Sequence, residues 1–169
     1  MIKRIFNPGS HTQSMNYVLI LLRLAIGVLM LTHGVGKFLK LFGDEPISFA
    51  DPIGIGETAS LVLAVFAEVV CSILIILGLV TRLSVIPLMV TMFVAVFIIH
   101  AGDEFKVLEL PLLYLLVYFT IAFTGPGKFS IDKYIYDIIE GKKGRDEIKS
   151  ALRGYGKEKH ITYVTGYKS

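Results

Sequence analysis

Six ionisable residues lie within or beside the long apolar stretches of this 169-residue chain. They are Arg23, His33, Lys37, Glu68, His100 and Glu109. A bilayer core accepts such side chains only where they pair with one another or serve a function. Together they offer cations, imidazoles and carboxylates, which suit either an interhelical hydrogen-bond network or a pocket for a quinone head group, a small anion or protons. We therefore take these six residues as the candidate intramembrane polar pocket.

Four apolar stretches must position these residues. The composition excludes an ordinary soluble domain, because 54% of residues are hydrophobic, 18% are charged and the mean hydropathy is +0.68. We expect an all-α fold, a four-helix transmembrane bundle over residues 17–127, with an N-terminal segment at 1–16 and a short basic C-terminal extension at 128–169. The expected helices run from Tyr17 to Phe38, Ala59 to Val80, Leu83 to Ile99 and Val107 to Phe123.

Small residues mark the faces where the helices should pack. Small side chains let membrane helices approach closely, and those at helical spacing in the first two stretches are Gly27, Gly34, Ala64, Ala67, Cys71 and Gly78. Gly27 and Gly34 share a face with Arg23 and Lys37, so both cations should point into the bundle or toward an interface. Cys71 is the single cysteine, so a dithiol redox mechanism is excluded.

The position of Glu68 in the second stretch requires a partner. With a rise of about 1.5 Å per residue, Arg23 lies about 9 Å, Glu68 about 18 Å and His33 about 24 Å from the cytoplasmic boundary. Either Arg23 or His33 can therefore stabilise the Glu68 carboxylate, and without a partner Glu68 should take up a proton.

Charge outside the apolar stretches predicts the orientation. Lys3, Arg4, Arg82 and the basic residues after Gly125 fall on one side, whereas the loop from Leu39 to Thr58 on the other side is rich in acidic residues. The positive-inside rule places both termini in the cytoplasm. The basic extension is better suited to anionic lipid than to nucleic acid, which we exclude as a partner.

No motif identifies a metal site or a catalytic residue. His33, His100, Glu68 and Glu109 are of types that bind metals, but no two ligands share one helix at a metal-binding spacing, so we expect no metal site. Beyond Gly125-Pro126-Gly127, Ser130 predicts the start of a short amphipathic helix from Ile131 to Glu140 at the membrane interface. The residues after it are predicted to form a mobile tail or a docking segment.

The arrangement resembles the DoxX (DoxD-like) family of membrane proteins over residues 17–136. The residues that carry the likeness are Arg23, Gly27, His33-Gly34, Lys37, Glu68, Leu77-Gly78-Leu79, Thr81-Arg82, His100, Glu109, Leu112-Leu113-Tyr114, Gly125-Pro126-Gly127, Ser130 and Asp132. The resemblance implies a multi-pass protein of the bacterial inner (plasma) membrane. The family takes its name from subunits of a membrane thiosulfate:quinone oxidoreductase.

Three functions follow from the residues and the resemblance together. The leading one is a small subunit of a quinone-linked redox complex, with no cofactor of its own and no activity alone, whose cytoplasmic face docks a redox partner. The second is a self-contained small-solute or proton transporter, built as a homo-oligomer, with Glu68 as the protonatable group. The third is a non-catalytic assembly protein in which every polar residue serves packing.

Overall fold

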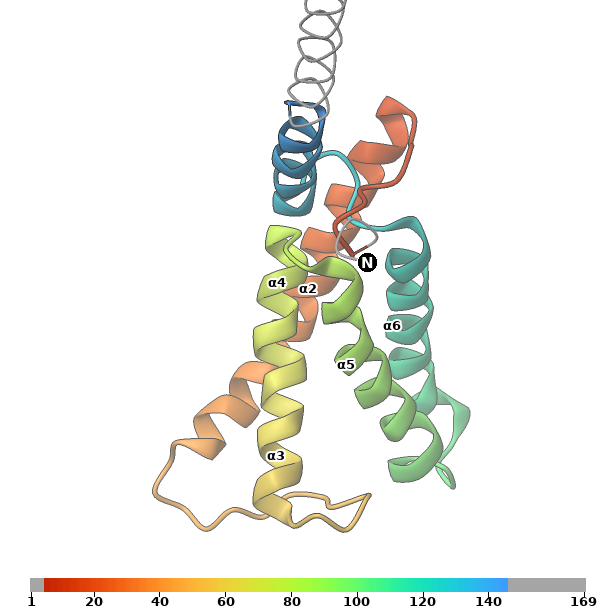
Figure 1. Cartoon of the computed structure of the whole chain (residues 1–169). Helices are drawn as coiled ribbons and strands as arrows, with labels where there is room; N and C mark the ends of the chain where they lie inside the picture. The colour runs from red at the N-terminus through yellow and green to blue at the C-terminus, as the bar shows by residue number, and fades with distance from the viewer. Residues whose placement is uncertain (1–4, 146–169) are drawn as a thin grey trace, which may run out of the picture.

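The computed structural model describes residues 5–145, and all regular structure in that range is helical. Four long helices form a bundle, and a shorter helix over residues 131–145 stands beyond one end of it (Figure 1). The second and third long helices each contain a π-helical segment. In chain order the elements are α2 (Gln13–Leu41), α3 (Glu57–Val65), η1 (Phe66–Cys71), α4 (Ser72–Leu77), α5 (Thr81–Val94), η2 (Ala95–Ile99) and α6 (Phe105–Thr124).

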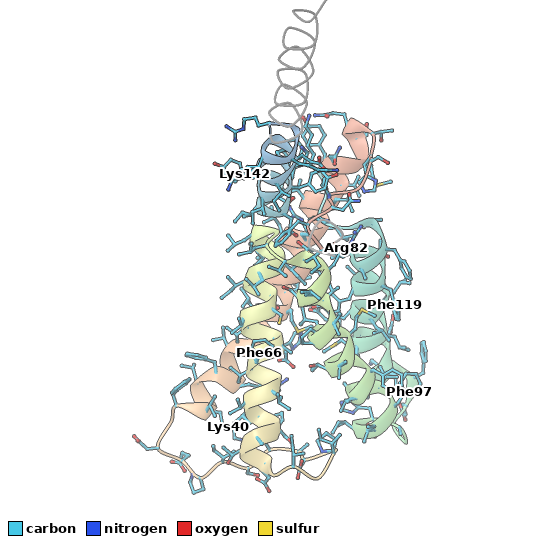
Figure 2. All side chains as sticks on the ribbon, viewed as in Figure 1. Lys40, Phe66, Arg82, Phe97, Phe119 and Lys142 are labelled. Atoms are coloured by element: carbon cyan, nitrogen blue, oxygen red, sulfur yellow. The ribbon has the colours of Figure 1, made fainter. Side chains whose placement is uncertain are left out.

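The four long helices are each long and apolar enough to cross a membrane. Their outward faces are apolar too, since large side chains such as Phe66, Phe97 and Phe119 are exposed. Phe97 and Phe119 project away from the bundle (Figure 2). Water does not favour so many exposed apolar side chains, whereas lipid does. The predicted all-α, four-helix transmembrane bundle is therefore confirmed.

The first helix begins earlier than expected. The sequence predicts its start near Tyr17, but α2 begins at Gln13 because Thr12 acts as its N-cap, accepting a hydrogen bond from the backbone N–H of Met15 at 3.4 Å. The last four residues of the predicted N-terminal segment therefore belong to the first span.

The bundle is tight at one end and open at the other. We call the end that carries the N-terminal segment and residues 125–145 the terminal end, and the end that carries residues 42–56 and 100–104 the loop end. The packing is closest between α5 and α6, and between α2 and the second helix, whereas α3 makes little contact with α5 or α6. The helices consequently diverge toward the loop end (Figure 1).

An apolar core fills the middle of the bundle. All four long helices contribute to it, and its fully buried members include Ile75, Val85, Leu88, Tyr118 and Ile121. Most of these residues lie in the halves of their helices nearer the terminal end, so the core lies between that end and the loop end.

The predicted short helix after Ser130 is present over residues 131–145. The Ser130 hydroxyl accepts a hydrogen bond from the backbone N–H of Lys133 at 3.2 Å, as an N-cap does. This helix continues in the direction of α4 and points away from the bundle, rather than crossing its end (Figure 1). Most of the predicted basic tail, residues 146–169, lies outside the described residues.

Candidate functional site

A cavity of about 490 Å³ occupies the loop end of the bundle. All four spans and the loop before α3 line it, and most of its wall is apolar, with side chains such as Leu63, Val90 and Leu110. Its polar side chains are His33, Lys37, Ser60, Glu68, Thr91, His100 and Tyr114. An apolar wall with a few polar groups is typical of a small-molecule site of this size.

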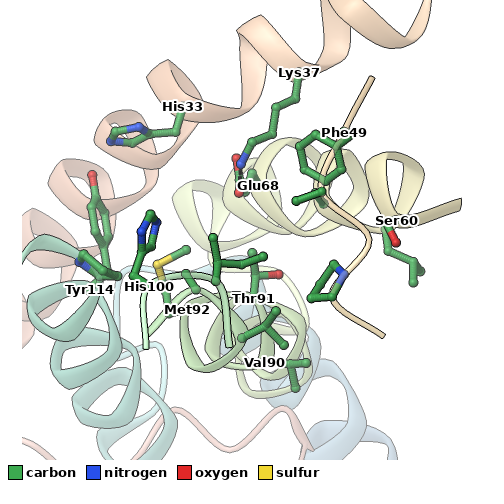
Figure 3. A pocket seen from close by; sticks show the side chains of 18 of the residues that line it. His33, Lys37, Phe49, Ser60, Glu68, Val90, Thr91, Met92, His100 and Tyr114 are labelled. Carbon is green, nitrogen blue, oxygen red and sulfur yellow. Dashed lines mark hydrogen bonds and ion pairs between the residues drawn. The ribbon is translucent and has the colours of Figure 1, made fainter. Parts of the chain in front are cut away.

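An ion pair between Lys37 and Glu68 is the main polar feature of the cavity (Figure 3). The Lys37 ammonium on α2 donates to Oε1 of Glu68 on η1. The Glu68 side chain is 2% exposed and that of Lys37 is 31% exposed, so the carboxylate depends on its partner far more than the ammonium does. The second carboxylate oxygen, Oε2, is buried and has no hydrogen-bond partner among residues 5–145.

Glycine brings these two residues together. A Cβ on Gly34 would lie only 2.9 Å from the backbone carbonyl carbon of Glu68, so α2 and η1 are in direct contact there. Lys37 lies three residues beyond Gly34, on the same face of α2, and its side chain therefore stands over Glu68. The long, flexible stem of lysine completes the reach.

The loop before α3 covers part of the cavity. Phe49, Pro52 and Ile53 face the cavity, and Asp51 fixes this loop to the start of α3. The Asp51 carboxylate accepts hydrogen bonds from the Ser60 hydroxyl at 2.8 Å and from the backbone N–H of Gly56 at 2.7 Å. These hydrogen bonds, led by that of Ser60, hold the pKa of Asp51 below its usual value because they favour the charged form.

Two histidines border the same cavity from different helices. His100 follows η2, and its Nδ1 lies 2.7 Å from Oδ2 of Asp103. His33 on α2 makes an edge-on contact with the ring of Tyr114 on α6, with ring centroids 5.9 Å apart. The cavity thus combines an ion pair, an oriented imidazole and a tyrosine within an apolar wall, an arrangement that can bind a small molecule with a polar head and an apolar body.

The comparisons with known proteins agree with the architecture. A model of the DoxX family matches residues 18–101. An uncharacterized protein of Haemophilus influenzae (strain ATCC 51907 / DSM 11121 / KW20 / Rd) is 33% identical over 127 residues, which cover 71% of this chain and 92% of the relative. This chain belongs to the DoxX family. It is a membrane protein, and no solved structure matches it.

Four of the six candidate pocket residues of this DoxX protein line the cavity, namely His33, Lys37, Glu68 and His100. Glu109 does not, because its position on α6 turns it to the exposed surface. Arg23 does not either, and it is not the partner of Glu68. Its guanidinium extends toward the terminal end, where Nη2 donates to the backbone carbonyl of Phe129. His33 is not the partner of Glu68 either, because Glu68 pairs with Lys37.

A second polar cluster surrounds Arg23 at the terminal end. The carboxylate of fully buried Asp132 accepts the backbone N–H groups of Val80 and Thr81, at 2.6 and 2.9 Å. Asp132 therefore caps α5 from a distant part of the chain and holds Val80 at a positive φ of 49°, which a β-branched residue rarely adopts. We call Arg23, Gly78, Val80, Thr81 and Asp132 the terminal cluster.

The terminal cluster also explains Gly78. This residue ends α4 with a φ of 67°, and a Cβ there would lie 1.9 Å from Nη1 of Arg23. Sequence reasoning missed Asp132 as a partner of this turn. The sequence signal for this contact was the position of Asp132, an acidic residue shortly after Gly125-Pro126-Gly127. These three residues end α6 and turn the chain back toward the bundle.

The other small residues lie inside the bundle. A Cβ on Gly27 would approach the side chain of Ile76 to 2.5 Å, so α2 and α4 are in close contact there. Ala67 and Cys71 belong to the core, and Ala64 lines the cavity. Within residues 5–145, no three His, Cys, Asp or Glu side chains form a group that could hold a metal ion.

Proposed function

We propose that this DoxX protein is a quinone-binding subunit of a redox complex in the bacterial inner membrane. The observation that carries the proposal is the cavity of about 490 Å³ whose apolar wall surrounds the Lys37–Glu68 ion pair and His100. A quinone has a flat head with two oxygens and a long apolar tail, and the cavity offers complementary chemistry for both parts.

The polar residues suit the head group. Lys37 has hydrogen-bond donors beyond the one used by Glu68, so it can donate to a head-group oxygen. Phe49 and Tyr114 offer aromatic surface to the ring. Because the positive charge of Lys37 and the negative charge of Glu68 cancel, the ion pair adds no net charge to the membrane interior when no ligand is bound.

The shape of the bundle suits the tail. Because α3 makes little contact with α5 and α6, we propose that the ligand enters between these helices at the loop end. The apolar wall extends to Leu63, Val90 and Leu110. A membrane-soluble ligand is thus able to enter from the bilayer without crossing water.

We place the redox partner on the cytoplasmic side. Lys128, Lys133, Lys142, Lys143 and Arg145 gather at the terminal end, so the positive-inside rule favours both termini in the cytoplasm. This chain has one cysteine, Cys71, which is buried, so electrons are to be carried by the quinone and by a cofactor of the partner protein. The terminal end supplies the docking face in this proposal.

A self-contained transporter receives less support. The fully buried core residues Ile75, Leu88 and Ile121 lie between the cavity and the terminal cluster, so an apolar layer separates the two polar sites. An assembly role remains the alternative in which the cavity binds nothing.

Direct binding tests the proposal. The protein is reconstituted into phospholipid vesicles and titrated with a short-chain benzoquinone, and binding is followed by quenching of the tyrosine emission of this tryptophan-free chain. We expect saturable quenching in the wild type and in Glu109→Gln, whose side chain lies outside the cavity. We expect much weaker binding in Ala95→Leu, which fills the cavity from η2. Equal quenching in all three proteins, or none, would contradict the proposal.

Isolation from the native membrane tests the redox role. Purification in mild detergent should retain a quinone and a partner with the absorbance of a flavin, a haem or an iron–sulfur centre. Light scattering of the same sample measures whether the protein is a homo-oligomer. Recovery of the protein with neither quinone nor partner would favour the assembly role.

A further inference from the structure

We infer that the cavity binds the reduced, hydroxyl-bearing form of its quinone ligand more tightly than the oxidised form, and that Asp103 sets this preference through His100. The inference rests on the proposed function. It assigns a role to Asp103, a half-exposed residue outside the predicted pocket.

The first step is the protonation of the His100 ring. Nδ1 of His100 lies 2.7 Å from Oδ2 of Asp103, and an ionised carboxylate only accepts hydrogen bonds. Nδ1 must therefore carry the hydrogen. In the neutral imidazole the other nitrogen, Nε2, then carries a lone pair and acts as an acceptor.

The second step is the direction of the ring. His100 lines the cavity while Asp103 does not, so the carboxylate holds the ring from outside the cavity. Figure 3 shows the His100 ring and the Lys37–Glu68 pair on different sides of the same open space. A ring-shaped head group placed between them would meet Lys37 with one oxygen and His100 with the other.

The third step compares the two redox forms. Lys37 can donate to a carbonyl or to a hydroxyl oxygen, so it does not distinguish them. When the His100 ring is neutral, a quinol hydroxyl donates to the lone pair of Nε2, whereas a quinone carbonyl would meet this lone pair with another acceptor. A site that is built to accept a hydrogen bond rejects a ligand that lacks the donor. The Glu68 carboxylate is a further acceptor beside the same space and favours the reduced form in the same direction.

The test measures the affinities of a short-chain benzoquinol and the matching benzoquinone by equilibrium dialysis against protein in nanodiscs, without oxygen. We expect the wild type to bind the quinol about tenfold more tightly, which is the loss typical of one mismatched hydrogen bond. In Asp103→Asn the amide can donate to Nδ1, which moves the ring hydrogen to Nε2 and should abolish or reverse the preference. Asp103→Glu should retain it.

A control variant and the two affinities together separate the role of Asp103 from quinone binding itself. Asp137→Asn, which removes another exposed carboxylate with a cationic partner, is the matched control and should leave both affinities unchanged. Equal affinities of the wild type for the two forms would overturn the inference and leave quinone binding standing. An unchanged preference in Asp103→Asn would overturn the role of Asp103. Absence of binding by either form would overturn the proposed function itself.

Discussion

Removing Lys37 should destabilise the protein more than removing Glu68, because the two partners differ in burial. The Glu68 side chain is 2% exposed and that of Lys37 is 31% exposed. Lys37→Met leaves a buried carboxylate without its cation, which costs about 3 kcal/mol, the lower end of the range for a broken buried pair given the partial exposure of Lys37. Glu68→Leu leaves an ammonium whose long stem can carry it to water, at a cost of about 1 kcal/mol.

The double variant isolates the pair. Lys37→Met with Glu68→Leu replaces two charges by two apolar side chains, so the loss should fall short of the sum of the single losses by about 2 kcal/mol. The assay is equilibrium unfolding in mixed detergent micelles, read by circular dichroism. The exposed Lys133–Asp137 pair provides the control cycle, with an expected coupling below about 0.5 kcal/mol.

The outcome also separates stability from function. The double variant should recover stability without recovering quinone affinity, because it no longer has the donor of Lys37. Strictly additive losses in the Lys37 and Glu68 cycle, or a larger loss in Glu68→Leu than in Lys37→Met, would refute the reasoning that burial of the carboxylate decides the energetics.

Three further outcomes follow from other parts of the fold. Gly78→Ala should lower the melting temperature strongly, since its φ of 67° disfavours a side chain and a Cβ would lie 1.9 Å from Arg23, whereas the control Gly36→Ala, with no atom within 4 Å of its Cβ, should raise it slightly. Asp132→Ala should cost about 1 to 2 kcal/mol of unfolding free energy, measured in the same micelles, through loss of the cap on α5. The folded pKa of Asp51 is lowered, so its contribution to loop stability is present above the ordinary pKa of an aspartate and is lost as the pH falls through the lower folded value. Hydrogen exchange of the loop should show this acid dependence in the wild type and lack it in Asp51→Asn.

The four spans were predictable because the length and hydropathy of an apolar run set whether it crosses a bilayer. Their ends were predictable only to within a few residues, as α2 shows, since a single N-cap such as Thr12 decides where the helix begins. The sequence carried both facts, but the second depends on one hydrogen bond rather than on a pattern.

The partner of Glu68 was not predictable from depth alone. Straight helices place Arg23 and His33 at similar distances from Glu68, and depth says nothing about which face of each helix meets the other. Contact at Gly34 decides the matter, because it puts Lys37 rather than Arg23 over the carboxylate. The prediction also placed Arg23 in the pocket, whereas its side chain turns to the other end of the bundle. The missing Cβ of Gly78 makes room for its guanidinium at the terminal end.

The π-helical segment η2 explains how His100 reaches the cavity. In a continuous α-helix with about 100° per residue, His100 would be rotated by about 80° from Met92, eight residues earlier. The wider turn of η2 holds more residues than an α-helical turn, so positions spaced by four, Met92, Val96 and His100, return to one face. Met92 and His100 both line the cavity, and Val96 is buried. In the second helix Ala64 and Glu68 also line the cavity, but their spacing of four keeps them on one face of an ordinary α-helix. Only the position of His100 therefore depends on a π-helical segment, an effect that a fixed helical period applied to the sequence does not contain.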